Sequence, residues 1–184
     1  TAAFEPFAGV RLSWRVASEL NNAGFDVLRS TSEHSGFSAV TRRLIAATGT
    51  GSYEFIDSTA VAGMRYFYQL QDLSLDGSRT LHGPVQVDLA LPAQFAVLQN
   101  YPNPFNPETR IRFQLPASGR TRVAVFNTLG QMVRSLADAS LPAGYHEINW
   151  DGRDEQGRPV GSAVYYYRVE SAGERAVKKM VLLR

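Results

Sequence analysis

The feature that most constrains the fold of this chain is a two-residue alternation of apolar and polar side chains. Within residues 110–116, the apolar side chains of Ile111, Phe113 and Leu115 alternate with polar ones, and residues 10–16 show the same pattern. A period of two places the apolar side chains on one face of an extended strand. The chain is therefore predicted to build half-buried β-strands.

Similar short segments recur at intervals of about ten residues, separated by turns rich in Gly, Pro and Asn. Further strands are expected in residues 25–30, 53–56, 64–70, 79–89, 122–127, 131–136, 141–150, 160–170 and 176–183. Many short strands at this spacing are typical of β-sandwiches. The expected fold class is all-β, with two tandem immunoglobulin-like or fibronectin III-like β-sandwiches.

The length of the chain predicts two domains. Its 184 residues fit two sandwiches of about 90 to 100 residues each, and a hydrophobic content of 44% is enough to build their cores. A short proline-containing stretch at residues 91–93 marks the boundary. We expect one domain in residues 1–90 and the other in residues 91–184.

Several classes of protein are excluded at this stage. No run of about 18 apolar residues occurs, so no transmembrane segment is predicted. The first residues lack the pattern of a signal peptide, and we expect the chain to begin inside a longer protein with further N-terminal domains. The absence of cysteine excludes disulfides, thiolate zinc sites and a cysteine nucleophile.

Charge is distributed unevenly between the two halves. Residues 1–90 carry 7 Arg against 9 Asp or Glu, a net charge of −2, whereas residues 91–184 carry 12 Lys or Arg against 8 Asp or Glu, a net charge of +4. A solvated surface explains this bias, and contact with an anionic polysaccharide or lipid headgroup is the alternative. Nucleic-acid binding is not expected, because a dense basic patch with a reading element is missing.

No arrangement of residues predicts catalysis, a cofactor or an established metal site. The histidines His34, His82 and His146 are far apart in sequence, and we interpret them as surface residues. Residues 49–52 resemble the start of a phosphate-binding loop but lack its lysine, so a hairpin loop is the better interpretation. The chain is not expected to be an enzyme.

Two features leave a ligand open as the alternative interpretation. The acidic loop with Asp151, Asp154 and Glu155 is a weak calcium candidate, but it does not have the ligand spacing of an EF-hand, and a solvated turn in which Asp151 bonds backbone amides is preferred. Along residues 165–167, Tyr166 faces opposite to the neighbouring tyrosines. One side is therefore expected in the core, with glycan stacking as the alternative on the other.

A proline-rich segment at residues 100–107 is the most informative part of the chain. Its closely spaced prolines exclude a helix. Asn103 and Asn106 are expected to close Asx-turns, and Tyr101 and Phe105 to provide two aromatic anchors.

The first domain has three informative segments, Leu12-Ser13-Trp14, the strand at residues 25–30 and the segment at residues 66–70. With these segments it resembles a fibronectin type III domain. The resemblance implies a spacer or binding module of an exported bacterial protein.

The second domain has a set of ordered motifs, whose main residues are Asn100, Tyr101, Pro102, Asn103, Pro104, Phe105, Asn106, Pro107, Trp150, Asp151 and Gly152. Shorter motifs lie at residues 129–131, 143–146 and 165–169. With these motifs the domain resembles the C-terminal sorting domain of the type IX secretion system and is similar to the immunoglobulin-like domain of flagellar hook-capping proteins. Residues 161–164 depart from the Ser-Gly sequence of many relatives at the start of the aromatic strand.

The carboxy-terminal residues have a basic start and an apolar end that predict both a final strand and a recognition element. They are Lys178, Lys179, Met180, Val181, Leu182, Leu183 and Arg184. Docking onto a translocon would use an exposed sheet edge.

The resemblance implies export through the periplasm, recognition by the outer-membrane secretion and sorting machinery, and a location on the cell surface or outside the cell. We expect a monomeric, non-catalytic region that directs secretion or surface attachment. A surface adhesion or carbohydrate-binding module is the alternative.

Overall fold

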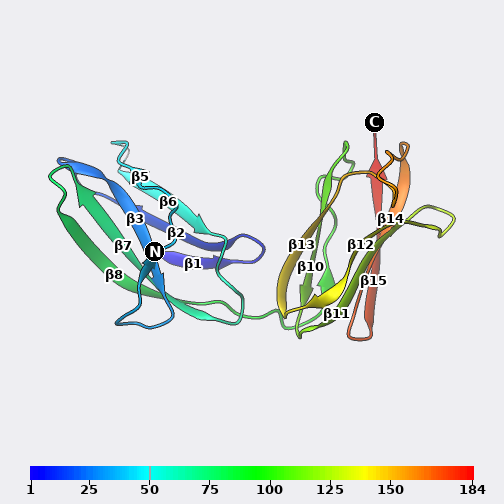
Figure 1. Cartoon of the computed structure of the whole chain (residues 1–184), viewed down its shortest axis with the longest axis horizontal. Coiled ribbons are helices and arrows are strands. Elements are labelled where there is room, and N and C mark those ends of the chain that lie inside the picture. The colour runs from blue at the N-terminus through cyan, green and yellow to red at the C-terminus, as the bar shows by residue number, and fades with distance from the viewer. Residues whose placement is uncertain (50) are drawn as a thin grey trace. The chain divides into compact units, whose positions relative to one another are not determined.

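The computed structural model of the chain describes residues 1–49 and 51–184 and confirms the all-β fold class (Figure 1). The described residues form β-strands and no helix, and so include no helix that is long and apolar enough to span a membrane. The chain divides into two compact units, Thr1–Ala90 and Leu91–Arg184. The hairpin loop predicted at residues 49–52 includes Thr50, which lies outside the described residues.

Unit 1 contains two antiparallel sheets. Their strand orders are β1-β2-β6 and β4-β3-β7-β8, with β5 also paired to β3. The strands are β1 (Ala2–Glu5), β2 (Gly9–Arg15), β3 (Asn22–Ser30), β4 (Ser38–Ala39), β5 (Ile45–Ala46), β6 (Ser52–Asp57), β7 (Arg65–Ser74) and β8 (Arg79–Asp88).

The two sheets of unit 1 pack face to face. Val10 and Leu12 of β2 share one buried cluster with Val27 of β3 and Tyr68 of β7. The alternation predicted for residues 10–16 therefore places its first apolar side chains in the core, as expected. This arrangement is that of a β-sandwich.

A buried carboxylate ties the two sheets of unit 1 together. Asp57, at the end of β6, accepts hydrogen bonds from Arg29 of β3 at 2.7 Å and from the Tyr68 hydroxyl of β7 at 2.8 Å. Thr59 donates to the same carboxylate through its hydroxyl at 2.6 Å and its backbone N–H at 3.0 Å. Each polar group in this buried network thus has a partner, which offsets the cost of removing the charge from water.

Unit 2 also contains two antiparallel sheets. Their strand orders are β13-β10-β9 and β12-β11-β14-β15. The strands are β9 (Ala96–Val97), β10 (Thr109–Leu115), β11 (Gly119–Phe126), β12 (Met132–Leu141), β13 (Gly144–Trp150), β14 (Ala163–Ser171) and β15 (Glu174–Leu182).

The core of unit 2 lies between its sheets. On β10, Ile111, Phe113 and Leu115 are buried as the alternation predicts, and they share a cluster with residues of the facing sheet. Other buried members are Val123, Val125, Trp150, Tyr165, Tyr167, Val169, Met180 and Leu182. The opposite facing of Tyr166 is confirmed, because its neighbours on both sides are buried and it is not.

Several strands are longer than their apolar patterns indicate. Strand β7 continues to Ser74 and β12 to Leu141, beyond the limits expected from the sequence. Backbone pairing with β8 and β11 carries both strands past the residues that alternate. Irregular registers between β11 and β12 also interrupt the period of two, so side-chain pattern alone underestimates these strands.

Candidate recognition site at the carboxy-terminal strand

The proline-rich segment is held by a buried asparagine. The Asn100 side-chain amide donates to the Thr109 hydroxyl at 2.8 Å and to the Pro102 carbonyl at 3.1 Å, and its backbone N–H donates to the Tyr167 hydroxyl at 2.9 Å. The Tyr167 hydroxyl in turn donates to the Leu98 carbonyl at 2.6 Å. Burial raises the pKa of Tyr167 to about 12, although the N–H of Asn100 partly opposes this shift. The hydroxyl is therefore a neutral donor that connects the segment to β14.

Only one of the two predicted aromatic anchors is an anchor. The Phe105 side chain is 2% exposed, and its ring centroid lies 5.6 Å from that of Trp150. Tyr101, in contrast, is 77% exposed, which corrects the prediction for that residue. The reason is local, because Tyr101 forms an isolated bridge with Arg110 that directs its side chain away from the core.

The proline-rich segment lies along the outer edge of β15. Phe105 forms a parallel bridge with Leu182: its N–H donates to the Val181 carbonyl at 3.0 Å, and its carbonyl accepts from the Leu183 N–H at 3.0 Å. The Gln99 side-chain amide donates to the Lys179 carbonyl at 2.8 Å. The expectation of an exposed edge is therefore corrected where these backbone groups of Lys179, Val181 and Leu183 are paired, whereas recognition of the tail stays a prediction.

Asn103 provides another contact with the same edge. Its side-chain oxygen accepts a hydrogen bond from the Val181 N–H at 3.0 Å. This corrects the prediction of an Asx-turn at Asn103, since that oxygen bonds to a residue far along the sequence. Asn106, the other position at which an Asx-turn is predicted, is exposed. Among the described residues, its side chain forms no hydrogen bond that would close such a turn.

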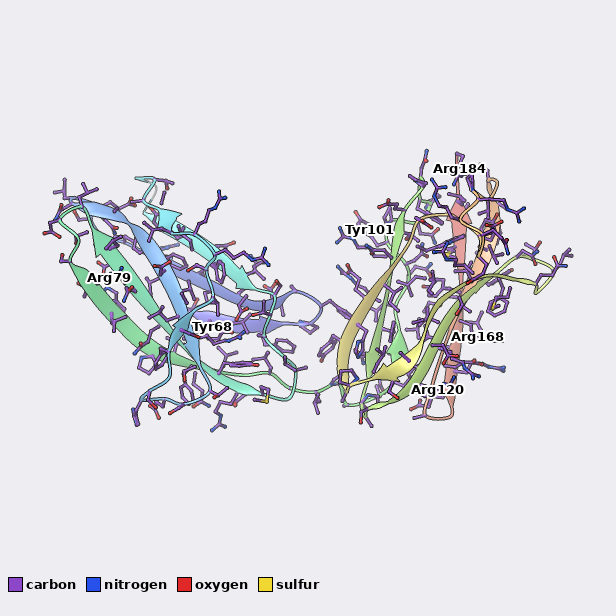
Figure 2. All side chains as sticks on the ribbon, viewed as in Figure 1. Tyr68, Arg79, Tyr101, Arg120, Arg168 and Arg184 are labelled. Atoms are coloured by element: carbon purple, nitrogen blue, oxygen red, sulfur yellow. The ribbon has the colours of Figure 1, made fainter. Side chains whose placement is uncertain are left out.

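The tail residues divide into two groups. Met180 and Leu182 are completely buried, while Lys178 and Val181 are half-buried. The side chains of Lys179, Leu183 and Arg184 are exposed. Since the buried members belong to the core, only the exposed ones are accessible to a partner. Figure 2 shows Arg184 and Tyr101 toward one end of unit 2 and Arg120 toward the other.

Gly152, in the loop after Trp150, contacts both the proline-rich segment and the end of the chain. It has a φ of 68°, and a Cβ at this position would lie 2.9 Å from the Pro107 carbonyl oxygen. Its own carbonyl accepts a hydrogen bond from the Arg184 guanidinium at 3.0 Å. The neighbouring Trp150 indole donates to the Arg153 carbonyl at 2.9 Å. The structure thus brings together the proline-rich segment, the Trp150 loop and the end of the chain.

The weak calcium candidate does not form a shared site. Asp154 accepts from the Arg158 guanidinium at 2.9 Å and from backbone N–H groups, while Glu155 accepts from the Ser135 N–H at 2.9 Å. Burial opposes ionisation of Asp154, but its bonds to the N–H and side chain of Arg158 outweigh that effect and lower its pKa. In the described part of the chain, no three His, Cys, Asp or Glu side chains come together as a metal would require. The Asp151 carboxylate accepts from the Arg153 N–H at 3.2 Å, as predicted for a solvated turn.

The structure also shows contacts that the sequence did not predict. Gln99, Thr109 and Tyr167 hold the proline-rich segment, and Ser162 accepts from the Arg184 N–H at 2.9 Å. Their non-adjacent partners lie between 7 and 80 positions away in the sequence, so no local pattern predicted these contacts. The histidines remain separate: His34 and His82 have exposed side chains, and His146 stacks on Phe113 with ring centroids 5.3 Å apart.

Residues 101–174, which lie within unit 2, match the family model of the FlgD Ig-like domain. No curated protein matches the sequence. Among solved structures, the chain is similar to dimeric latent PorU from Porphyromonas gingivalis, with 15% identity and a TM-score of 0.41, covering 100% of this chain and 19% of that one. A second similar structure is PorZ from the same organism, described as an essential bacterial surface component of the type-IX secretion system. Its identity is 20% and its TM-score 0.36, covering 63% of this chain and 15% of PorZ.

A third similar structure is that of the FN1–FN3 domains of chicken CNTN1, with 9% identity and a TM-score of 0.35. The match covers 100% of this chain and 62% of that one. The chain therefore spans less than a fifth of the length of PorU and of PorZ.

Proposed function

We propose that unit 2 is a sorting domain that directs the protein to which it belongs through type IX secretion to the bacterial surface, and that neither unit is catalytic. The observation that carries this proposal is the joining of the carboxy-terminal strand to the proline-rich segment through Asn103 and Phe105. These two parts of the chain are also those on which the family resemblance rests.

The recognised element in this proposal is a folded surface. Because Met180 and Leu182 are in the core, folding of unit 2 holds the exposed side chains of the tail in fixed positions. Lys179 and Leu183 then lie on either side of Val181, whose backbone is bonded to Asn103 and Phe105. A partner would contact this basic and apolar pair while the paired strand edge keeps their positions constant.

Deleting the whole tail is a poor test, because it also removes core residues. A sharper test fuses the full chain to an exported reporter in a bacterium with type IX secretion and compares Lys179→Ser/Leu183→Ser with a control, Arg110→Ser/Leu129→Ser. Each variant changes one exposed cation and one exposed leucine of unit 2. Thermal melting of the purified chains checks that both variants are folded.

The expected result is that the tail variant accumulates in the periplasm while the control reaches the surface. Surface display of both variants at the unmodified level would make the proposal wrong. Equal loss of display for both folded variants would also oppose it, because the effect would then not be specific to the tail.

A further inference from the structure

The outer face of the sheet β12-β11-β14-β15 is a second candidate binding surface, which shares Lys179 with the tail described above. Side chains on this face alternate with the buried Val123, Val125 and Tyr167 of the core. The face bears the cations Arg120, Arg122, Arg168, Arg175 and Lys179 and the acids Asp138 and Glu170. Cations therefore exceed acids on it.

Ion pairing leaves part of this positive charge unbalanced. Asp138 is shared between Arg120 at 2.8 Å and Arg122 at 3.2 Å, and Glu170 pairs with Arg168 at 3.3 Å. The hydrogen bond from Arg120 lowers the pKa of Asp138, so this carboxylate stays ionised at neutral pH. Arg175 has no ion pair with an acidic side chain within 4.0 Å among the described residues. Because Asp138 serves both Arg120 and Arg122, and Arg175 has no acidic partner, positive charge remains that an anionic ligand could neutralise.

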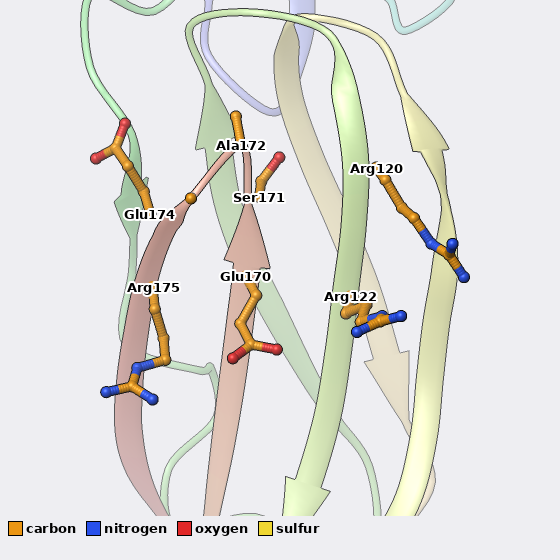
Figure 3. Close-up of a pocket in the computed structure, with 8 residues that line it drawn as sticks. Arg120, Arg122, Glu170, Ser171, Ala172, Glu174 and Arg175 are labelled. Atoms are coloured by element: carbon orange, nitrogen blue, oxygen red, sulfur yellow. The ribbon is translucent and has the colours of Figure 1, made fainter.

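A shallow hollow of about 710 Å³ lies at this charged end of the face. Its charged lining residues are the cations Arg120, Arg122 and Arg175 and the acids Glu170 and Glu174, so cations are still in excess. Figure 3 shows Arg120 and Arg122 on one side of Glu170 and Arg175 on the other. A guanidinium group on each side of the hollow can donate two parallel hydrogen bonds to a carboxylate or phosphate.

Aromatic and apolar side chains lie on the same face, in a row that joins the end of β11 to the start of β12. The strand register places Met132, Phe126, Tyr166 and Lys179 in one row across the sheet. Tyr166 is 36% exposed, and the Arg168 guanidinium carbon lies 4.6 Å from the Phe126 ring centroid. Four neighbouring strands span about 14 Å, enough for several consecutive sugar units. An exposed aromatic ring offers a flat surface on which the apolar face of a sugar can stack.

We propose that this face binds an anionic polysaccharide, with a sugar ring on Tyr166 and its acidic groups on Arg122 and Arg175. A flat, open surface with spaced cations suits an extended, hydrated chain, and the shallow hollow does not enclose a small molecule. Lys179 lies on this face next to Tyr166 and also belongs to the tail. The two roles are therefore distinguished by changing Arg122, Arg175 and Tyr166 in the binding test and Lys179 and Leu183 in the sorting test.

The test measures binding of the full chain to polygalacturonate, a carboxylate-bearing polysaccharide, and to neutral dextran by isothermal titration calorimetry at low salt. Arg122→Ser/Arg175→Ser and Tyr166→Thr are each expected to weaken polygalacturonate binding about tenfold or more. Arg110→Ser/Arg112→Ser, which removes two cations from β10 in the other sheet, is the matched control and is expected to bind like the unmodified chain. Binding is also expected to weaken as salt rises.

Three outcomes would overturn the proposal. One is failure of the unmodified chain to bind polygalacturonate at low salt. Another is equal weakening by the β10 control, which would indicate attraction by net charge alone. The third is tight binding to phosphatidylglycerol vesicles that Arg122→Ser/Arg175→Ser abolishes while polygalacturonate binding is unchanged, which would assign the face to lipid. Circular dichroism of each variant confirms that the sheet is intact.

Discussion

The side-chain oxygen of Asn103 accepts a hydrogen bond from the backbone N–H of Val181 at 3.0 Å, across 78 positions of sequence. This bond satisfies a donor on the outer edge of β15 that would otherwise face solvent or another strand. It belongs to a series of contacts along that edge, with Gln99 before it and Phe105 after it. The proline-rich segment thus covers an edge that could otherwise pair with a second chain.

Removing the Asn103 side-chain oxygen, which accepts from the Val181 N–H, is expected to cause a modest loss of stability. Asn103→Ala should lower the free energy of unfolding of unit 2 by about 1 kcal/mol, the usual net contribution of one hydrogen bond. The measurement is urea unfolding followed by Trp150 fluorescence in a Trp14→Phe background, which leaves one tryptophan in the chain. Asn106→Ala is the control, and an equal loss there would show that the bond to Val181 is not the cause.

The burial of Phe105 predicts a much larger effect. Phe105→Ala should destabilise unit 2 by about 3 to 5 kcal/mol, because it leaves a cavity beside Trp150. Tyr101→Ala removes a ring that is exposed and should change stability by about 0.5 kcal/mol or less. The same fluorescence measurement applies to both. Similar losses for the two variants would contradict the assignment of Phe105 as the single aromatic anchor.

Gly152 tests the close contact between the Trp150 loop and the proline-rich segment. Gly152→Ala places a Cβ 2.9 Å from the Pro107 carbonyl oxygen and also disfavours the positive φ. Gly157 has a similar φ of 75°, but a Cβ there would meet no atom within 4 Å. Gly157→Ala therefore measures the cost of the positive φ alone. We expect Gly152→Ala to lower the melting temperature of unit 2 by clearly more than Gly157→Ala does. Equal shifts would mean that the contact with Pro107 is readily relieved.

The buried Asp57 predicts that unit 1 loses stability in acid. Burial raises the pKa of Asp57, but hydrogen bonds from Thr59 and Tyr68 and the charge of Arg29 outweigh it, so the pKa lies below its usual value of 3.8. The stabilisation that ionised Asp57 gives to unit 1 is therefore fully present above pH 3.8, the usual pKa. It is lost as the pH falls through the lower pKa that Asp57 has in the folded state. Hydrogen exchange of β3 and β7 amides, measured as a function of pH, should show this loss.

Asp57→Asn should remove that acid dependence and destabilise unit 1 by about 3 kcal/mol at neutral pH, because Arg29 keeps its charge without a carboxylate. Asp88→Asn is the control, since Asp88 pairs with Arg65 on the surface, where an ion pair contributes little. An unchanged pH profile for Asp57→Asn would assign the acid sensitivity to another carboxylate.

The acidic loop of unit 2 predicts no response to calcium. Asp154 and Glu155 are each bonded to groups of the chain and point to different partners. Addition of about 5 mM CaCl₂ should leave the melting temperature of the full chain unchanged within about 1 °C, because a ligand stabilises only the state that binds it. A larger rise that Asp154→Asn abolishes would revive the calcium site.

The sequence by itself determined the all-β class and the inward face of β10, because a period of two assigns side chains to sides of a strand whatever its neighbours are. It also placed Tyr165 and Tyr167 opposite to Tyr166 for the same reason. These predictions need only local geometry.

The tertiary structure alone decided which strands meet and which backbone groups remain free. The sequence suggested two aromatic anchors and an open carboxy-terminal edge, yet Tyr101 is exposed and residues 99–105 cover much of the edge. The gathering of cations on the outer face of the β12-β11-β14-β15 sheet likewise depends on the register of β11, β14 and β15. Long-range pairing depends on how the whole core packs, and this information is not contained in any short segment of the chain.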